Sequence, residues 1–429
     1  MPLAILISTR LFPFLKWPGV IPLGADAGIY LYNFQTTLQG KYTIISDLLK
    51  LFFWPTTATV FDFYIIINII IGLMVYLITK EYFGKQAAFF SFLIFALSVP
   101  QYLAYFAFYW QMMIALCLTL TILYLIKKQS WLIIPLGGFL GGIHAVSLIP
   151  LSITMLIYLF FAENKKFIFF SGLGIAVVYL LISWQEFFSW LPTYLIENHG
   201  LVNENYSLII KETLKGHFID WHTYFNLVIV YFPLAIIGFM QSLKVKNCGV
   251  IVAYLLTNSI LIYFNFIFYN RFIIPLDISL IIFAGLAVAS LVNKVYFSPL
   301  GKIALSLLFI FLFIFNSYHV WHTRPFITDT SEIEEIKSLS QLPPDTEIIT
   351  INGFYYPYLL AFSQLPRLQI KNINIETDNG LVGILEKYDY PVYIYTGKKL
   401  KNLVNIDLDK HYFLQISDNV WLFKPNITY

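Results

Sequence analysis

Charge is scarce in this sequence. Lys, Arg, Asp and Glu make up 12% of its 429 residues, whereas a soluble domain carries about 25%. The hydrophobic share is 59% and the mean hydropathy is +0.72. A net charge of +3 provides no basic surface, so no nucleic-acid partner is expected. The composition predicts a polytopic membrane protein with a smaller polar C-terminal part.

Cysteine is also scarce, which excludes a disulfide framework. The two cysteines, Cys117 and Cys248, lie in or beside apolar runs and cannot cross-link the polar C-terminal part. A cleavable signal peptide is not expected at residues 1–23. The apolar stretch there is short, Arg10 and Lys16 interrupt it, and no small-residue cleavage site follows.

Long apolar runs fill the chain up to about residue 321, and crossing the hydrocarbon takes about 20 such residues. The prediction is an α-helical polytopic membrane domain over residues 1–321. Two of the runs are short and contain Pro100 and Pro135, which predicts broken or re-entrant helices. Four glycines between 137 and 142 predict close helix packing. The eleven spans are placed at about 2–23, 60–79, 86–100, 109–126, 130–142, 144–161, 167–184, 223–243, 248–268, 272–293 and 303–321.

Lysine pairs recur in the short turns between alternate spans. They are Lys80 and Lys85, Lys127 and Lys128, Lys165 and Lys166, Lys244 and Lys246, and Lys294 and Lys302. Short cytoplasmic loops retain Lys and Arg, so these turns and the N-terminus are predicted to be cytoplasmic. The outer segments are then 24–59, 185–222 and the part from residue 322 onward.

The C-terminal part, residues 322–429, is predicted to be a small extracytoplasmic α/β domain, because helical and strand patterns alternate along it. Ser331 and Glu334 match a capping box at the start of its first helix. It contains neither a Gly-rich phosphate loop nor a nucleophile elbow. The expected helices are Ser331–Leu339, Tyr356–Phe362 and Gly380–Tyr388, and the expected strands are Glu347–Ile351, Arg367–Ile370, Val392–Tyr395, Tyr412–Ile416 and Val420–Lys424.

An acidic residue directly follows the first span. Residues 24–32 read G-A-D-A-G-I-Y-L-Y and place Asp26 at the outer membrane surface, with aromatic residues four and six positions later. Asp is a preferred N-cap, so one interpretation is that Asp26 only caps a helix beginning at Ala27.

The same motif resembles the first outer loop of the membrane GT-C glycosyltransferases. It is most similar to the polyprenyl- or dolichyl-phosphate-sugar-using branch, which includes protein mannosyltransferases and the lipid A aminoarabinose transferase. The resemblance implies that Asp26 is catalytic and that Tyr30 binds substrate in outer loop 24–59. Many members carry an Asp-Glu pair here, whereas Ala27 follows Asp26 in this chain.

The resemblance implies an inverting enzyme that transfers a sugar outside the cytoplasm. The donor would be a polyprenyl-phosphate sugar held in membrane lipid, and the acceptor a lipid, glycan or protein. The resemblance specifies no cofactor and leaves a divalent cation open. A carboxylate at the membrane edge, with its pKa raised by desolvation, suits the role of base toward an acceptor hydroxyl.

A leaving phosphate needs positive charge, and Arg271 is predicted at the outer end of a span. Guanidinium pairs with phosphate in a two-pronged geometry. The segment R-F-I-I-P is also similar to a late segment of these enzymes. The alternative is that Arg271 only extends toward lipid head groups.

Several other polar residues have both a functional and a structural interpretation. His144 near an outer turn is a site candidate or a hydrogen-bonding helix residue, and Asp62 either lines the site or faces water. Asp277 inside a span requires a hydroxyl or another helix as its partner. The sequence His217-x-x-Asp220-Trp221-His222 matches no strong metal pattern, and no metal ligands are assigned. Candidates for stacking on sugar rings are Tyr105, Tyr109 and Trp110.

Two other classes of protein compete with this assignment. A transporter or flippase would place ionisable residues at the bilayer midplane and usually has matching halves, which the sequence lacks. A polysaccharide polymerase or ligase would use a large late loop. The segment 185–222 is such a loop, but its only lysines are Lys211 and Lys215.

Overall fold

The computed structural model describes most of the chain. It leaves out residues 19–22, 25–30, 32–56, 199–217, 246–247, 267–268, 296–298, 326, 328, 344–345, 352–354, 364, 366–368, 374–384, 386–387, 389, 391, 399–412 and 424–429. The chain divides into two compact units. The helical unit comprises Met1–Pro13 and Phe61–Thr323, and the sheet unit comprises Phe14–Val60 and Arg324–Tyr429.

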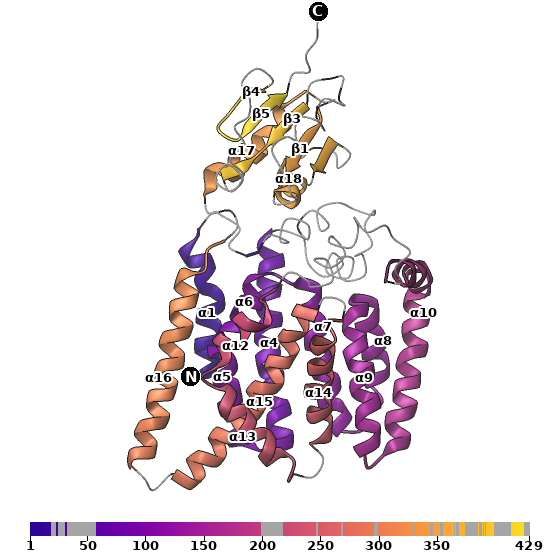
Figure 1. The fold of residues 1–429 in the computed structure, drawn as a ribbon, viewed down its shortest axis with the longest axis vertical. Helices are drawn as coiled ribbons and strands as arrows, with labels where there is room; N and C mark the ends of the chain where they lie inside the picture. The colour runs from indigo at the N-terminus through magenta and orange to yellow at the C-terminus, as the bar shows by residue number, and fades with distance from the viewer. Residues whose placement is uncertain are drawn as a thin grey trace, which may run out of the picture. The chain divides into compact units, whose positions relative to one another are not determined.

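Helices occur at all eleven apolar runs that the sequence indicates (Figure 1). They are α1 (Pro2–Lys16), α4 (Thr57–Phe83), α5 (Lys85–Leu97), α6 (Val99–Phe106), α7 (Trp110–Lys127), α8 (Ile133–Ile143), α9 (Ala145–Phe161), α10 (Lys165–Asn198), α12 (Trp221–Val228), α13 (Phe232–Ser242), α14 (Gly249–Tyr263), the 3-10 helix η1 (Tyr269–Phe272), α15 (Ile273–Val295) and α16 (Pro299–His322). Helix α10 contains a break in helical geometry at Ser183.

The helical unit is a multi-pass membrane unit. Among the described residues, five helices are long and apolar enough to cross a membrane, and seven if each bent helix pair counts as one span. Helices α8, α9 and α14 are apolar but shorter. The number of eleven crossings therefore stays a prediction.

The break predicted near Pro100 is present. Helices α5 and α6 are bent by 53°, and Ser98 between them caps α6 by accepting a hydrogen bond from the Gln101 amide at 3.3 Å. Pro100 lies in the first turn of α6, where its missing N–H costs nothing. A second pair, α12 and α13, is bent by 84°. Bent backbone of this kind in a membrane unit is tolerated where protein surrounds it.

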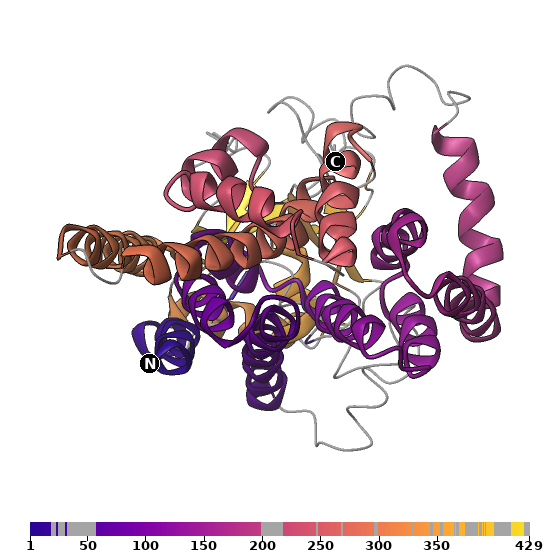
Figure 2. The same cartoon turned by 90° about the horizontal axis from the view of Figure 1, so that it is seen from below.

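Helix α15 lies at the centre of the helical unit and α16 at its edge. The apolar stretch through α15 is 94% buried, whereas that of α16 is 17% buried. Figure 2 shows α16 beside α1 at one edge of the unit, and the Phe12 and Trp321 rings contact each other at 5.7 Å. A Cβ on Gly238 of α13 would overlap the Phe283 carbonyl of α15, so glycine permits this close crossing.

The predicted close packing at the glycine cluster is also present. Added Cβ atoms at Gly137, Gly138 and Gly141 of α8 would overlap side chains of α10. The small residues let these two helices approach each other.

The lysine-bearing turns gather at one end of the helical unit, here called the lysine end. Lys128 pairs with Glu81 at 2.7 Å, and Asn164 donates to Gln129 at 3.0 Å. These contacts join the turns that follow α4, α7 and α9. Gln241 donates to Ser290 at 3.3 Å, which places the ends of α13 and α15 together. In Figure 1 this is the lower end of the bundle.

The sheet unit contains a five-stranded mixed sheet in the order β2-β1-β3-β5-β4. Strands β1, β2 and β3 are parallel, with Ile348 opposite Ile370, and β5 pairs antiparallel to β3 and β4. Its elements are α17 (Thr330–Ser338), η2 (Leu339–Gln341), β1 (Ile348–Ile351), α18 (Tyr356–Phe362), β2 (Ile370–Ile373), β3 (Val392–Tyr395), β4 (Phe413–Gln415) and β5 (Val420–Phe423).

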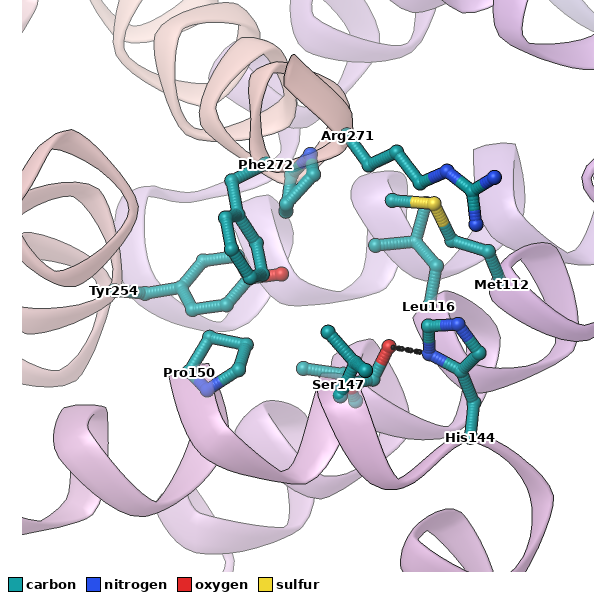
Figure 3. A pocket seen from close by; sticks show the side chains of 11 residues that line it. Met112, Leu116, His144, Ser147, Pro150, Tyr254, Arg271 and Phe272 are labelled. Carbon is teal, nitrogen blue, oxygen red and sulfur yellow. Dashed lines mark hydrogen bonds between the residues drawn. The ribbon is translucent and has the colours of Figure 1, made fainter. Parts of the chain in front are cut away.

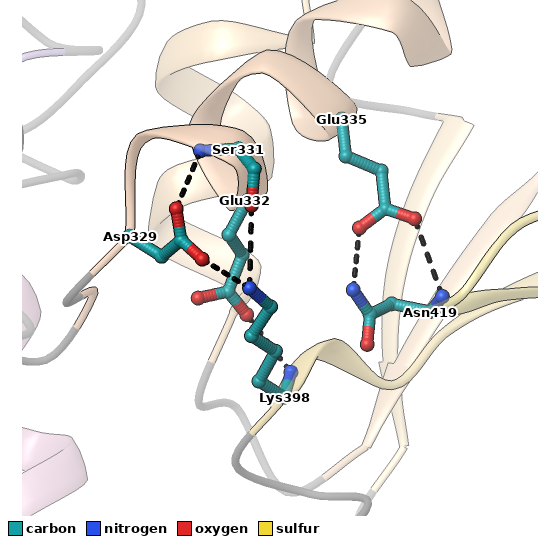
Figure 4. A network of polar contacts seen from close by, with 6 residues as sticks. All are labelled: Asp329, Ser331, Glu332, Glu335, Lys398 and Asn419. Atoms are coloured by element: carbon teal, nitrogen blue, oxygen red, sulfur yellow. Dashed lines mark hydrogen bonds and ion pairs between the residues drawn. The ribbon is translucent and has the colours of Figure 1, made fainter.

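Polar contacts bind α17 to the sheet (Figure 4). Glu335 accepts hydrogen bonds from the Asn419 amide at 3.2 Å and its side chain at 2.5 Å. Glu332 accepts from the Lys398 amide at 2.9 Å. The predicted capping box is wrong, because Asp329 caps α17 by accepting from the Ser331 amide at 2.9 Å. The second strand begins at Ile370, where the predicted Arg367–Ile370 strand ends.

Candidate functional site

A pocket lies within the helical unit, where α7, α8, α9, α14 and the start of α15 meet (Figure 3). The space that its side chains border, counted together with the open solvent at its mouth, is about 420 Å³. The residues that line it are Met112, Leu116, Thr119, His144, Val146, Ser147, Pro150, Tyr254, Arg271, Phe272 and Pro275. It therefore brings together two of the predicted site residues, Arg271 and His144.

Arg271 is placed by the 3-10 turn η1, which precedes α15. Its guanidinium lies 5.0 Å from the centre of the Tyr109 ring, in a cation–π contact. Tyr109 follows Phe108, a buried residue with a φ of 60° in the left-handed region. That conformation is unfavourable for a bulky residue, and such backbone strain tends to occur at functional sites. The turn between α6 and α7 presents Tyr109 to Arg271.

His144 lies between α8 and α9 and serves both helix ends. Its Nδ1 is 2.7 Å from the Ser147 hydroxyl oxygen, which fixes the orientation of the ring. Figure 3 shows the His144 ring and the Arg271 guanidinium on the same side of the pocket. One cation and one imidazole therefore face a shared space.

The remaining lining of the pocket is largely apolar. Met112, Leu116, Pro150 and Phe272 surround the polar groups. A positive charge in an apolar pocket binds an anion more strongly than the same charge in water. The arrangement suits a molecule with an anionic head and an apolar body.

Asp277 lies six residues after Arg271 and is fully buried. The Asp277 carboxylate accepts hydrogen bonds from four side chains. They are Ser98 at 2.9 Å, Gln101 at 2.9 Å, Tyr224 at 3.1 Å and Tyr231 at 2.5 Å. Ser98 and Tyr231 stand at the breaks of the two bent helix pairs. Asp277 therefore links both bent helix pairs to α15. Its hydroxyl partners are of the kind that the sequence predicted for a buried carboxylate.

Other predicted site residues lie elsewhere. Asp26 and Tyr30 fall outside the described residues. Asp62, near the start of α4, is exposed and does not line the Arg271 pocket. Tyr105 and Trp110 are 0% and 2% exposed, and their stacking on sugar rings stays a prediction. Their rings pack against Tyr64, at 5.3 and 5.8 Å.

The sequence around Asp220 has a structural role. Asp220 caps α12 by accepting from the Thr223 amide at 2.9 Å and its hydroxyl at 2.7 Å. These hydrogen bonds lower the pKa of the Asp220 carboxyl. Within the part of the chain that the structure describes, no group of three or more His, Cys, Asp or Glu side chains is placed to hold a metal ion.

The sequence did not reveal that Tyr109 contacts Arg271 or that four donors converge on Asp277. Both arrangements join segments that are far apart in the chain. The available signal for Asp277 was its charge within an apolar run, which requires polar partners without identifying them.

Comparisons with known proteins give fold likeness and little sequence likeness. No family model matches the chain, and no curated protein matches it by sequence. The Archaeoglobus fulgidus oligosaccharyltransferase AglB, solved with an inhibitory peptide and a dolichol-phosphate, superposes with a TM-score of 0.58 at 12% identity, covering 92% of this chain and 69% of that chain. The apo form of the same species' enzyme gives 0.55 at 13% identity, with the same coverage.

ArnT from Cupriavidus metallidurans, in the apo state, gives a TM-score of 0.53 at 11% identity, covering 98% of this chain and 92% of that chain. The oligosaccharyltransferase and ArnT are both GT-C glycosyltransferases. The resemblance inferred from the motif at Asp26 is therefore confirmed at the level of the fold.

Proposed function

We propose that the chain is an inverting membrane glycosyltransferase that moves a sugar from a polyprenyl-phosphate donor to an acceptor on the extracytoplasmic face. The acceptor would be a lipid, a glycan or a protein. The observation that carries the proposal is the pocket that brings Arg271 and His144 together, with Arg271 also in contact with Tyr109. The chain that holds this pocket has a fold similar to those of the oligosaccharyltransferase and ArnT.

The proposed orientation places the lysine end in the cytoplasm. Arg271 stands at the start of α15, and the Gln241–Ser290 contact with the lysine end lies near its other end. The positive-inside rule then assigns the pocket to the outer half of the membrane. The same rule, with eleven crossings, assigns outer loops 24–59 and 185–222 and the domain from 322 to 429 to the extracytoplasmic side.

In the proposed reaction, Arg271 binds the donor phosphate and stabilises the charge that grows on it as it leaves. The acceptor oxygen forms a bond to the anomeric carbon while the bond from that carbon to the phosphate oxygen breaks. Asp26 takes the acceptor proton, and the lipid phosphate keeps the bonding electron pair. Attack opposite the leaving group inverts the anomeric carbon.

The other predicted site residues have supporting roles in this proposal. His144, held by Ser147, hydrogen-bonds the donor beside Arg271. Tyr30 and Asp62 contact the sugar or the acceptor. A divalent cation is compatible with the proposal, and the transfer step as written does not require one.

The test measures sugar transfer in membranes that contain the full chain. Polyprenyl-phosphate mannose, glucose and aminoarabinose serve as probe donors, and release of free polyprenyl phosphate with labelling of an acceptor is the readout. Asp26→Asn should slow transfer about 10²- to 10⁴-fold, the usual contribution of a positioned base. Arg271→Ala should raise the donor KM by about tenfold or more, because a charged hydrogen bond is lost.

Arg324→Ala is the matched control, since Arg324 is exposed in the sheet unit. Full transfer by well-expressed Asp26→Asn would remove the catalytic assignment. Movement of a solute or lipid across vesicles without sugar transfer would favour the transporter or flippase instead. Chain extension of a lipid-linked polymer would favour the polymerase or ligase.

A further inference from the structure

Arg10 is a second arginine that the proposed reaction does not use. It lies in α1 and is 0% exposed. Among the described residues, no Asp or Glu pairs with it. A permanently charged group has been taken out of water without a carboxylate to balance it.

Two aromatic rings lie beside the Arg10 guanidinium. Its central carbon lies 5.0 Å from the Tyr105 ring centre and 5.7 Å from the Tyr102 ring centre. The Tyr105 hydroxyl donates to the Arg10 carbonyl at 2.8 Å, so helix α6 holds both the backbone and the side chain of Arg10. The guanidinium is fixed in position before any partner arrives.

The edge of the guanidinium has a specific pattern of used and unused donors. Nη1 donates to the Thr9 hydroxyl at 3.3 Å. Nε and Nη2 are buried and make no hydrogen bond. These two atoms form one edge of the planar group, and their N–H bonds point the same way, which matches two oxygens of a phosphate.

We propose that the Nε and Nη2 edge of Arg10 binds a phosphate group at a site separate from the Arg271 pocket. The phosphate belongs either to a membrane lipid or to free phosphate. A lipid can approach from the bilayer, because α1 lies at the edge of the helical unit beside α16 (Figure 2).

The sequence of α1 provides a means of access to this buried edge. Pro13 lies inside α1 and cannot donate a hydrogen bond to the Thr9 carbonyl. The last turn of the helix is therefore less firmly held than the turns before it. In the proposal, this turn moves to admit the phosphate, while the Tyr105 hydroxyl keeps its hydrogen bond to the Arg10 carbonyl.

The experiment measures thermal unfolding of the full chain in detergent micelles. Three probes are added in turn: inorganic phosphate, a short-chain polyprenyl phosphate and the corresponding phosphate-free polyprenol. Arg271→Met is used as the background, so that a remaining phosphate response arises outside the proposed donor pocket. Arg10→Met is then added to this background, with Arg10→Lys as the variant that keeps the charge without the two-pronged edge.

A rise in the unfolding temperature with a phosphate probe, absent with polyprenol, is expected in the Arg271→Met background. Arg10→Met should abolish this rise, and Arg10→Lys should weaken phosphate binding by about tenfold. A response to polyprenyl phosphate alone identifies a lipid source, and a response to inorganic phosphate as well identifies the phosphate group alone as sufficient.

Two results would overturn the proposal: a phosphate response unchanged by Arg10→Met, or no response in the Arg271→Met background. The latter would leave the donor role of Arg271 intact. Conversely, an Arg10-dependent response without any sugar transfer would retain this site and reject the proposed function.

Discussion

Two opposite charges are buried against the same short helix, α6, and they are treated differently. Asp277 receives hydrogen bonds from Ser98 and Gln101 at the start of α6 and from two tyrosines. Arg10 lies against Tyr102 and Tyr105 further along α6 and leaves two of its donors unused. The anion has a complete set of partners, whereas the cation has an incomplete one.

The difference separates a structural charge from one available to a ligand. Hydrogen bonds to a buried carboxylate offset most of the free energy that its removal from water costs. If the carboxylate is removed, each donor that loses its acceptor destabilises the fold by about 1–3 kcal/mol. The two cation–π contacts with Tyr102 and Tyr105 each stabilise the buried Arg10 charge by about 2 kcal/mol. These contacts provide no hydrogen-bond acceptor for the Nε and Nη2 donors of Arg10.

Of the changes considered, replacing Asp277 should reduce the stability of the fold the most, because its hydrogen bonds are complete. Asp277→Ala removes an acceptor shared by four buried side chains and should lower the free energy of unfolding by about 3 kcal/mol. Chemical denaturation in mild detergent measures this change. Asp62→Ala, which alters an exposed carboxylate, is the control, and equal losses in both variants would contradict a special role for Asp277.

Removing a single donor should have a smaller effect. Tyr231→Phe deletes the 2.5 Å hydrogen bond to Asp277 and should cost about 1–3 kcal/mol, because the carboxylate keeps three other donors. The same denaturation measurement applies. Tyr263→Phe, at a 79% exposed residue, should change nothing, and an unaffected Tyr231→Phe would mean that this hydrogen bond is dispensable.

A double-mutant cycle measures whether Arg10 and Asp277 are energetically coupled through α6. If each is balanced by its own neighbours, the effects of Arg10→Met and Asp277→Asn should add to within about 0.5 kcal/mol. The measurement compares the unfolding free energies of the two single variants and the double variant. A coupling energy above about 1 kcal/mol would mean that Arg10 and Asp277 compensate each other across the helix.

The smallest effect on stability is expected for the exposed ion pair between Asp329 and Lys398 in the sheet unit. Hydrogen bonding to Lys398, with help from the Ser331 amide, lowers the pKa of Asp329 from 3.8 to about 2. The lowered pKa means that this stabilisation is present above pH 3.8 and is lost as the pH falls through 2. Acid unfolding followed by circular dichroism should show Asp329→Asn less stable than the wild type at pH 4, with the two converging near pH 2.

A constant difference between these two proteins down to pH 2 would show that the Asp329 carboxylate charge is not its source. Asp418→Asn, at a neighbouring acid of the sheet unit, provides the matched control in the same titration.

The sequence predicted whatever depends on local pattern. Apolar runs located the helices, Pro100 located a break, and the alternation around Val392–Tyr395 located β3 with its bounds. The helix start at Asp329 was missed because Asp and Ser both suit a cap and lie two residues apart.

The candidate site was less accessible to sequence reasoning, because it depends on how distant helices cross. Arg271 could be singled out by its charge, but its contact with Tyr109 requires the left-handed turn at Phe108. Tyr105, Tyr109 and Trp110 look alike in the sequence and all three are buried, and what distinguishes Tyr109 is its contact with Arg271. Asp26 stays a prediction, since it lies outside the described residues.

The near-complete enclosure of α15 has a mechanical consequence. A helix that is packed on all sides, as α15 is, cannot rotate or shift along its axis without displacing the helices around it. The pocket arginine at one tip and the Ser290 contact toward the other are therefore parts of one stiff body.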